Sequence, residues 1–206
     1  MISRNSNQAD VVSALRRLQM RELPDGPKPL EANCELCGTS MPEDHRHLLQ
    51  TEERRIVCVC EACWALRSGD AEFRPTGSRF TWLEGFTLPS ELWARFGIPI
   101  GLAFFLRGGD GVAALYPSPA GATESELDMS AWEALVSLNP VLETLETDGE
   151  SLIVSRLSDP PQYAIAPIDE AYRLVGMIKV NWQGITGGEA VDQVIAQFFE
   201  ELKARA

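Results

Sequence analysis

The sequence predicts an α+β fold in which a zinc-ribbon-like cysteine module precedes a mostly antiparallel sheet packed with helices. All five cysteines of the 206-residue chain lie between Cys34 and Cys63, and both histidines, His45 and His47, lie in the same window. After Arg79, segments with the two-residue period of strands alternate with segments of helical spacing. We therefore expect three regions: an N-terminal helix with a proline-rich linker (1–29), a metal module (30–75) and an α+β domain (76–206).

Four of the cysteines form two Cys-x-x-Cys pairs separated by 22 residues. Each short turn can aim two sulfurs at one ion about 2.3 Å away, and a closed shell of four thiolates leaves no open position for chemistry. We therefore expect a structural zinc site on Cys34, Cys37, Cys60 and Cys63. Iron bound as in a rubredoxin is the alternative, because Cys-x-x-Cys-Gly resembles a rubredoxin knuckle, although the second pair, followed by Trp64, lacks that glycine.

The residues between the two pairs predict an antiparallel hairpin with strands at 45–51 and 54–60. If the turn is Glu52-Glu53, cross-strand partners sum to 105, so His47 faces Cys58 and His45 faces Cys60. Cys58 is then the surplus thiol, either a small buried residue or the reactive group of a thiol-dependent enzyme. For the two histidines we expect an exposed position or a hydrogen bond to a thiolate rather than metal ligation.

Several observations bear on the compartment in which the protein works. Apolar residues recur at helical spacing within 10–22, and a proline-rich linker follows at 23–29. The first 20 residues contain no apolar core segment, so we expect no export signal. No run of about 18 apolar residues is present, so we expect no membrane-spanning helix. An odd number of cysteines argues against a disulfide framework, and we expect a cytoplasmic protein.

The charge of the chain narrows the class of partner. Thirty acidic residues against 18 basic ones give a net charge of −12 and a pI near 4.6. Nucleic-acid binding draws most of its affinity from neutralised phosphates, which such a surface repels on average. We therefore expect no nucleic-acid partner, and we expect protein partners instead.

The first half of the α+β region predicts a strand, a short helix, a hairpin and a rigid loop. The strand is expected at 80–86, and the helix follows through Phe96, with Ser90 as a candidate N-cap. Apolar runs at 98–106 and 111–116 predict a hairpin. The segment 116–125, with two prolines and several hydroxyls, is interpreted either as a strand-to-helix connection or as an exposed loop for partner recognition.

The second half predicts two helices and a second hairpin. A helix opens near Asp128 and is interrupted at Pro140, and a hairpin is expected at 151–157 and 162–168. Apolar or small residues at every even position over 172–182 favour a strand, while Asp169-Glu170 and the residues after them could equally begin a helix. Val191, Val194, Ile195, Phe198, Phe199 and Leu202 predict a final helix after Gly187-Gly188.

Catalytic motifs are missing from the sequence of the α+β region. It contains no histidine or cysteine beyond residue 63, so any general base there must be a carboxylate, a lysine or a tyrosine. No glycine-rich nucleotide-binding loop is present either. The sequence therefore favours a role other than catalysis.

Three stretches of the chain carry a resemblance to a known family. They are Cys34-Glu-Leu-Cys-Gly with Met41-Pro-Glu-Asp-His-Arg-His-Leu-Leu49, the segment 116–125, and Pro167-Ile-Asp-Glu-Ala-Tyr-Arg-Leu-Val-Gly176. Together they resemble an uncharacterised bacterial family of unknown function whose members are often encoded beside high-affinity uptake nickel-iron hydrogenases. The resemblance implies an accessory or maturation role with a hydrogenase subunit or a maturation factor as partner. It implies no chemistry.

The sequence thus predicts a cytoplasmic, zinc-binding accessory protein that binds other proteins. The two alternatives from other functional classes are a rubredoxin-like iron electron-transfer protein and a thiol-dependent enzyme that uses Cys58.

Overall fold

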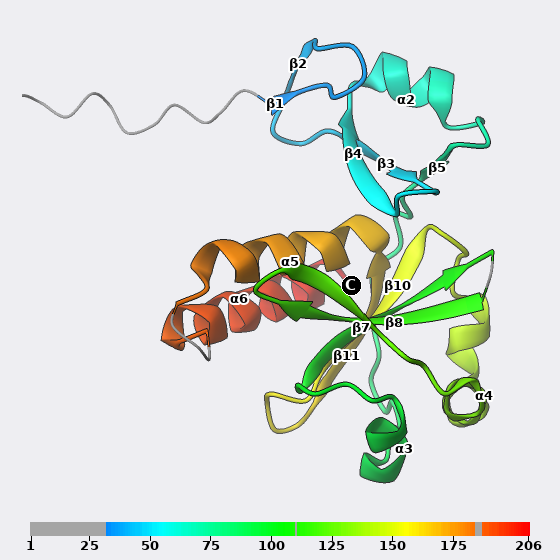
Figure 1. The fold of residues 1–206 in the computed structure, drawn as a ribbon, viewed down its shortest axis with the longest axis vertical. Coiled ribbons are helices and arrows are strands. Elements are labelled where there is room, and N and C mark those ends of the chain that lie inside the picture. The colour runs from blue at the N-terminus through cyan, green and yellow to red at the C-terminus, as the bar shows by residue number, and fades with distance from the viewer. Residues whose placement is uncertain (1–31, 110, 184–186) are drawn as a thin grey trace, which may run out of the picture.

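The structure is a computed structural model that describes residues 32–109, 111–183 and 187–206 (Figure 1). The helix and linker expected within 1–29 lie outside these residues. Below, residues 32–75 are called the metal module and residues 76–206 the body. No helix in the described ranges is long and apolar enough to cross a bilayer.

The metal module consists of small strands and one short helix. β1 (Ala32–Asn33) pairs with β2 (Ser40–Met41), and the central hairpin of β3 (Arg46–Gln50) and β4 (Arg55–Val59) is extended by β5 (Phe73–Pro75) in the order β4-β3-β5. The helix α2 (Glu61–Arg67) follows β4 directly. The module's own buried apolar cluster consists of Cys34, Met41, Leu48, Val57, Val59 and Phe73.

The predicted hairpin register is confirmed. His47 lies opposite Cys58, and Gln50 opposite Arg55, so every cross-strand pair sums to 105. The residues between the paired strands are 51–54, and Arg54 adopts a positive φ of 48°. His45 lies just outside β3, because strand pairing begins at Arg46 and Val59.

The body is built on a six-stranded sheet in which all neighbouring strands are antiparallel. Its order is β6-β11-β10-β7-β8-β9. The strands are β6 (Thr81–Trp82), β7 (Leu102–Gly108), β8 (Gly111–Ser118), β9 (Gly121–Ser125), β10 (Glu150–Ser155) and β11 (Gln162–Pro167). Both predicted hairpins, β7–β8 and β10–β11, are therefore confirmed, as is the mostly antiparallel α+β fold.

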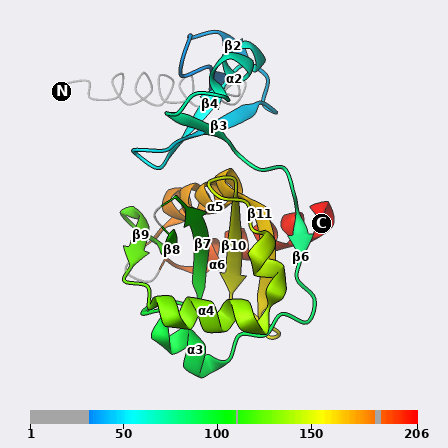
Figure 2. The same cartoon turned by 90° about the vertical axis from the view of Figure 1, so that its right-hand side faces the viewer.

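Helices cover both faces of this sheet (Figures 1 and 2). One face packs against α5 (Ile168–Asn181) and α6 (Glu189–Arg205), and the other against α3 (Ser90–Arg95), α4 (Met129–Leu138) and the 3-10 helix η1 (Pro140–Thr144). Because side chains alternate along a strand, Phe104 enters the first core and Phe105 the second. The sheet is thus buried between two layers of helices.

One predicted strand is wrong, because 172–182 forms the main part of helix α5. The buried residues of α5 recur at helical spacing, with Ile168, Ala171, Leu174, Val175 and Ile178 on one side. The alternation that favoured a strand included Gly176, which is exposed. The alternative, a helix that begins near Asp169, was the correct interpretation.

The segment 116–125 is neither of the loops expected from its prolines. β8 continues through Ser118, and β9 returns from Gly121, so the segment is a hairpin with Tyr116 paired with Thr123. Gly121 has a φ of 125°, which the tight turn requires and which other residues rarely adopt. Pro117 can lie in β8 because the pairing of β8 with β7 ends at Leu115, so only the edge strand β9 pairs with this part of β8.

Smaller differences concern the start of the body. The strand expected over 80–86 pairs only at Thr81 and Trp82. Pro89, not Ser90, occupies the N-cap position of α3, and the Ser90 hydroxyl accepts a hydrogen bond from Arg156. Asp128 caps α4 as predicted, accepting from the backbone N–H groups of Ser130 and Ala131.

Candidate metal centre

The first cysteine pair lies in the turn between β1 and β2. The Gly38 N–H donates to the Cys34 carbonyl at 2.8 Å, and the Cys34 N–H donates to the Thr39 carbonyl at 2.8 Å. Gly38 adopts a φ of 76°, a conformation that glycine reaches without steric cost. These bonds close the turn and bring the sulfurs of Cys34, which is buried, and Cys37, which is exposed, into one cluster.

The second pair lies at the start of a helix instead of in a second turn between strands. Cys60 is the N-cap of α2, and its sulfur accepts a hydrogen bond from the Cys63 N–H at 3.5 Å. A helix N-terminus presents free N–H groups and the positive end of the helix dipole, and both stabilise a thiolate. The start of α2 therefore places the second pair of sulfurs beside free backbone N–H groups.

The four sulfurs of Cys34, Cys37, Cys60 and Cys63 lie within 4.8 Å of one another. The distance from Cys37 Sγ to Cys60 Sγ is 3.7 Å. Four ligands at about 2.3 Å in a tetrahedron stand about 3.8 Å apart, so this spacing fits one zinc-sized ion. All five cysteines are free thiols. The structure brings together the four cysteines that the sequence predicts as one cluster. The cluster could hold a metal ion.

The acidities of these thiols differ widely. Hydrogen bonds with the Thr39 hydroxyl and backbone lower the pKa of Cys37 to about 6. The hydrogen bond with Cys37, together with burial and the other neighbouring sulfurs, raises the pKa of Cys63 to about 12. One thiolate thus suppresses the ionisation of the next, as expected where negative groups share a site. A cation would relieve this repulsion.

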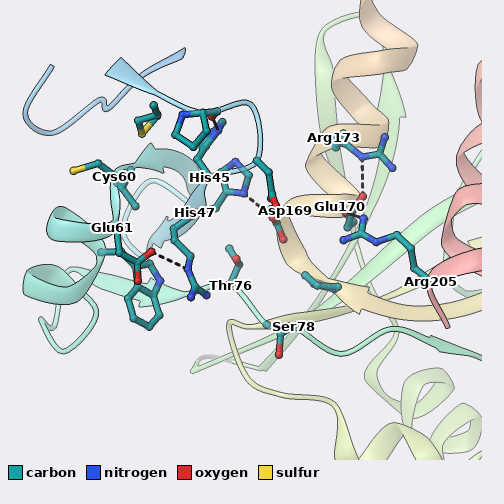
Figure 3. A pocket seen from close by; sticks show the side chains of 18 of the residues that line it. His45, His47, Cys60, Glu61, Thr76, Ser78, Asp169, Glu170, Arg173 and Arg205 are labelled. Carbon is teal, nitrogen blue, oxygen red and sulfur yellow. Dashed lines mark hydrogen bonds and ion pairs between the residues drawn. The ribbon is translucent and has the colours of Figure 1, made fainter. Parts of the chain in front are cut away.

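A second cluster lies on the adjacent hairpin and contains His45, His47 and Cys58. Its three ligand atoms also lie within 4.8 Å of one another. The two imidazole rings are 4.8 Å apart, edge to face. His47 Nδ1 is 2.8 Å from Asp169 Oδ2, a contact between the metal module and the first turn of α5 (Figure 3).

These contacts shift the protonation of all three groups. The hydrogen bond to Asp169, reinforced by Cys58, raises the pKa of His47 to about 10. Burial opposes charge on His45, but Cys58 and the Pro42 carbonyl together raise its pKa. The hydrogen bond with His47 lowers the pKa of Cys58, and burial acts in the opposite direction. The neighbouring His45 also lowers it. Without a metal, the cluster therefore favours a thiolate beside imidazolium.

A cleft of about 790 Å³ lies between the metal module and the body (Figure 3). His45, His47 and Cys60 line it from the module, while Asp169, Glu170, Arg173 and Arg205 line it from the body. Glu170 is buried and accepts hydrogen bonds from both arginines. The cleft therefore carries both signs of charge.

Sequence reasoning found the four-cysteine cluster and the pairing of His47 with Cys58, but it missed Asp169. That residue is 122 positions from His47, and an acid in the first turn of a helix is more often a complement to the helix dipole. The expected pairing of His45 with Cys60 is replaced by the proximity of His45 to Cys58. The packing of α5 against the hairpin is what brings Asp169 to His47.

No curated protein and no solved structure matches the chain. One family model, described as "Family of unknown function (DUF5947)", matches residues 33–206, which span both the metal module and the body. On the strength of that match, the chain belongs to this family.

Proposed function

We propose that the protein is a zinc-binding accessory protein in which one zinc ion on Cys34, Cys37, Cys60 and Cys63 fixes the shape of the metal module. The observation that supports this most is the convergence of the four sulfurs within 4.8 Å. A closed shell of four thiolates suits a structural ion, which contributes to folding and not to catalysis. The reducing environment that keeps such thiols free is the cytoplasm.

The local structure supports zinc over iron. Rubredoxin-like iron sites were considered because of the glycine after the first pair. Only Gly38 supplies this feature, whereas the second pair opens a helix and is followed by Trp64 within that helix. Zinc has no electronic preference for a particular ligand geometry, so a site made from one turn and one helix N-terminus can hold it.

Exposed apolar residues on the metal module support a protein partner. Leu36 lies between the first two cysteines and is 38% exposed, and Leu66 in α2 is 76% exposed. Both side chains are attached to the segments that carry the zinc ligands. A rigid metal site would hold them in a fixed arrangement, which reduces the entropy lost when a partner binds.

The proposed partner is a subunit or maturation factor of a nickel-iron hydrogenase. This part of the proposal rests on the resemblance to a family encoded beside such enzymes. In this role the metal module and its exposed leucines would contact the partner, and the body would support the module. An accessory role of this kind requires no catalytic group in the body.

The metal is tested by elemental analysis of protein purified without oxygen or affinity-tag metal, together with a visible spectrum. We expect zinc bound at the four-cysteine cluster and no colour, with that zinc absent from Cys60→Ser. Iron with thiolate charge-transfer bands would replace the proposal with electron transfer.

The partner is tested in cells of a host that contains the hydrogenase. Deletion of the gene is expected to impair hydrogen uptake and large-subunit processing, and wild-type protein should restore both. Leu66→Ser should restore them poorly, whereas Val180→Ser, an equally exposed apolar residue on α5 (85% exposed), should restore them fully. Unchanged hydrogen uptake and processing in the deletion strain would exclude the hydrogenase role.

A further inference from the structure

We propose that His45, His47 and Cys58 form a second metal site, which binds a divalent transition-metal ion of the zinc class through two imidazole nitrogens and one thiolate. The three ligand atoms lie within 4.8 Å of one another, as do those of the four-cysteine cluster. Imidazole and thiolate together are the ligands that zinc and its neighbours in the first transition row prefer. The site is separate from the proposed structural zinc, because it shares none of its ligands.

The hairpin register builds this cluster. His47 is directly opposite Cys58 on the paired strand. His45 lies two residues before His47, and residues two apart along an extended chain point to the same side. The two rings accordingly meet edge to face at 4.8 Å. The sequence thus places all three side chains on one side of the β3–β4 hairpin.

Both histidines have the outer hydrogen bonds that orient metal ligands. His45 Nδ1 is 3.0 Å from the Pro42 carbonyl, and His47 Nδ1 is 2.8 Å from the Asp169 carboxylate. A carbonyl or carboxylate oxygen can only accept, so Nδ1 donates in each ring. The Nε2 atom of each neutral imidazole then keeps its lone pair for a metal. Histidine ligands in metal sites are usually held in this way.

The surroundings of His45 point to a missing ligand. Its Nε2 atom is buried, and no hydrogen-bond partner for it is found among the described residues. Buried polar nitrogen atoms without a partner are rare because they lose their interactions with water. A metal ion bound to both histidines accounts for the Nε2 atom of His45.

Three protein ligands leave one position of a tetrahedral ion open. His45 and His47 line the cleft between the metal module and the body, so a fourth ligand from solvent can reach the ion there (Figure 3). Asp169 belongs to the body while all three ligands belong to the metal module. Metal bound at this site would therefore also strengthen the contact between the two regions.

The test is a titration of the metal-free, reduced full-length protein with Co²⁺, followed by its visible spectrum, and with Zn²⁺, followed by elemental analysis. We expect two equivalents of metal per chain. His47→Gln should bind one equivalent and keep the spectrum of the four-thiolate site, and Cys60→Ser should lose that spectrum instead. Glu43→Gln, an exposed acid beside the cluster, is the matched control and should bind two. Each variant is first checked by circular dichroism.

Asp169→Asn gives a second measurement that leaves all ligands in place. It should weaken binding of one equivalent by about 10–100-fold and leave the other unchanged. Metal binding that neither His47→Gln nor Asp169→Asn affects would overturn the proposal, whether the wild-type protein binds one equivalent or two. Failure of the structural zinc site would look different: the wild-type protein would bind one equivalent, which His47→Gln removes and Cys60→Ser leaves in place.

Discussion

The metal module and the body differ in how much apolar surface each buries. The module's own cluster contains six buried residues, one of them the candidate ligand Cys34. The two clusters of the body contain 19 and 15, of which Leu49 alone comes from the module. A small region cannot bury enough surface to offset the entropy of its chain, and a metal or a disulfide usually compensates.

The position of the metal module on the body follows from a few polar contacts and two apolar ones. His47 contacts Asp169, and Arg54 forms an ion pair with Glu124 in β9 at 3.5 Å. Leu49 and Ile56 pack against the core formed with α5 and α6. We therefore expect the module to depend on a metal for its own fold and on the body for its placement, and we expect the body to fold without either.

The largest expected effect is loss of the metal module in Cys60→Ser. Removal of one of four ligands leaves three neighbouring thiols without a closed site, and six buried residues cannot replace the binding energy of the ion. Amide exchange should show the module unprotected and the body unchanged. Cys58→Ser makes the same chemical change outside the four-cysteine cluster and should keep the module folded. Wild-type protection of the module in Cys60→Ser would show that the cluster contributes nothing to the fold.

The converse change is Phe105→Ala in the body. Phe105 is fully buried; its ring stacks on Trp132 with centroids 5.5 Å apart and meets Phe96 edge to face at 5.0 Å. The cavity should lower the free energy of unfolding of the body by about 3–5 kcal/mol, measured by denaturant titration. Leu138→Ala, on the exposed side of α4, should change it by less than about 0.5 kcal/mol. Metal content should stay at the wild-type value in both.

An intermediate effect is expected in the segment that joins the two regions. Arg79 donates to the buried Glu150 carboxylate at 2.8 Å and to the Thr144 hydroxyl at 3.0 Å. Arg79→Met should cost about 1.5–3 kcal/mol, because it leaves a buried carboxylate with fewer donors. Lys179→Met, which removes an exposed cation from α5, should cost less than about 0.5 kcal/mol in the same denaturant titration. Equal losses of unfolding free energy in the two variants would mean that net charge, and not the contact of Arg79 with Glu150, determines the stability measured here.

The smallest effect concerns the pH dependence of the body. Hydrogen bonds from Ser130, and then the Arg95 guanidinium, lower the pKa of Asp128 to about 2. The carboxylate therefore stabilises the folded state fully above its ordinary pKa near 3.8, and this contribution is lost as the pH falls towards 2. Asp128→Asn keeps a good N-cap and should change little at pH 7 except through loss of the Arg95 pair. The melting temperature, measured between pH 5 and about 2, should depend less on pH in the variant than in the wild type.

The sequence predicted best the elements whose signals are local. The Cys-x-x-Cys spacing predicted which four cysteines lie together, and the short turn predicted the hairpin register, because each depends on residues close together in the chain. Likewise, the buried positions of α6 repeat at helical spacing over its length and left one interpretation.

The failures occurred where tertiary packing decides between two local patterns. Over 172–182 the sequence fits a strand or a helix, and the apolar face of the sheet selects the helix α5 by burying Leu174 and Ile178. Asp169 could not be assigned to the histidine cluster, because its contact with His47 exists only once α5 lies under the hairpin. A pairwise contact across 122 residues leaves no local signal in a single sequence.

The dependence of one region on a metal, and the independence of the other, is tested most directly by hydrogen exchange with and without a strong chelator under reducing conditions. We expect amides of β3 and β4 to lose protection after chelation, and amides of β7 and β10 in the centre of the sheet to keep it. Protection that survives in β3 and β4 after complete removal of metal would contradict the account.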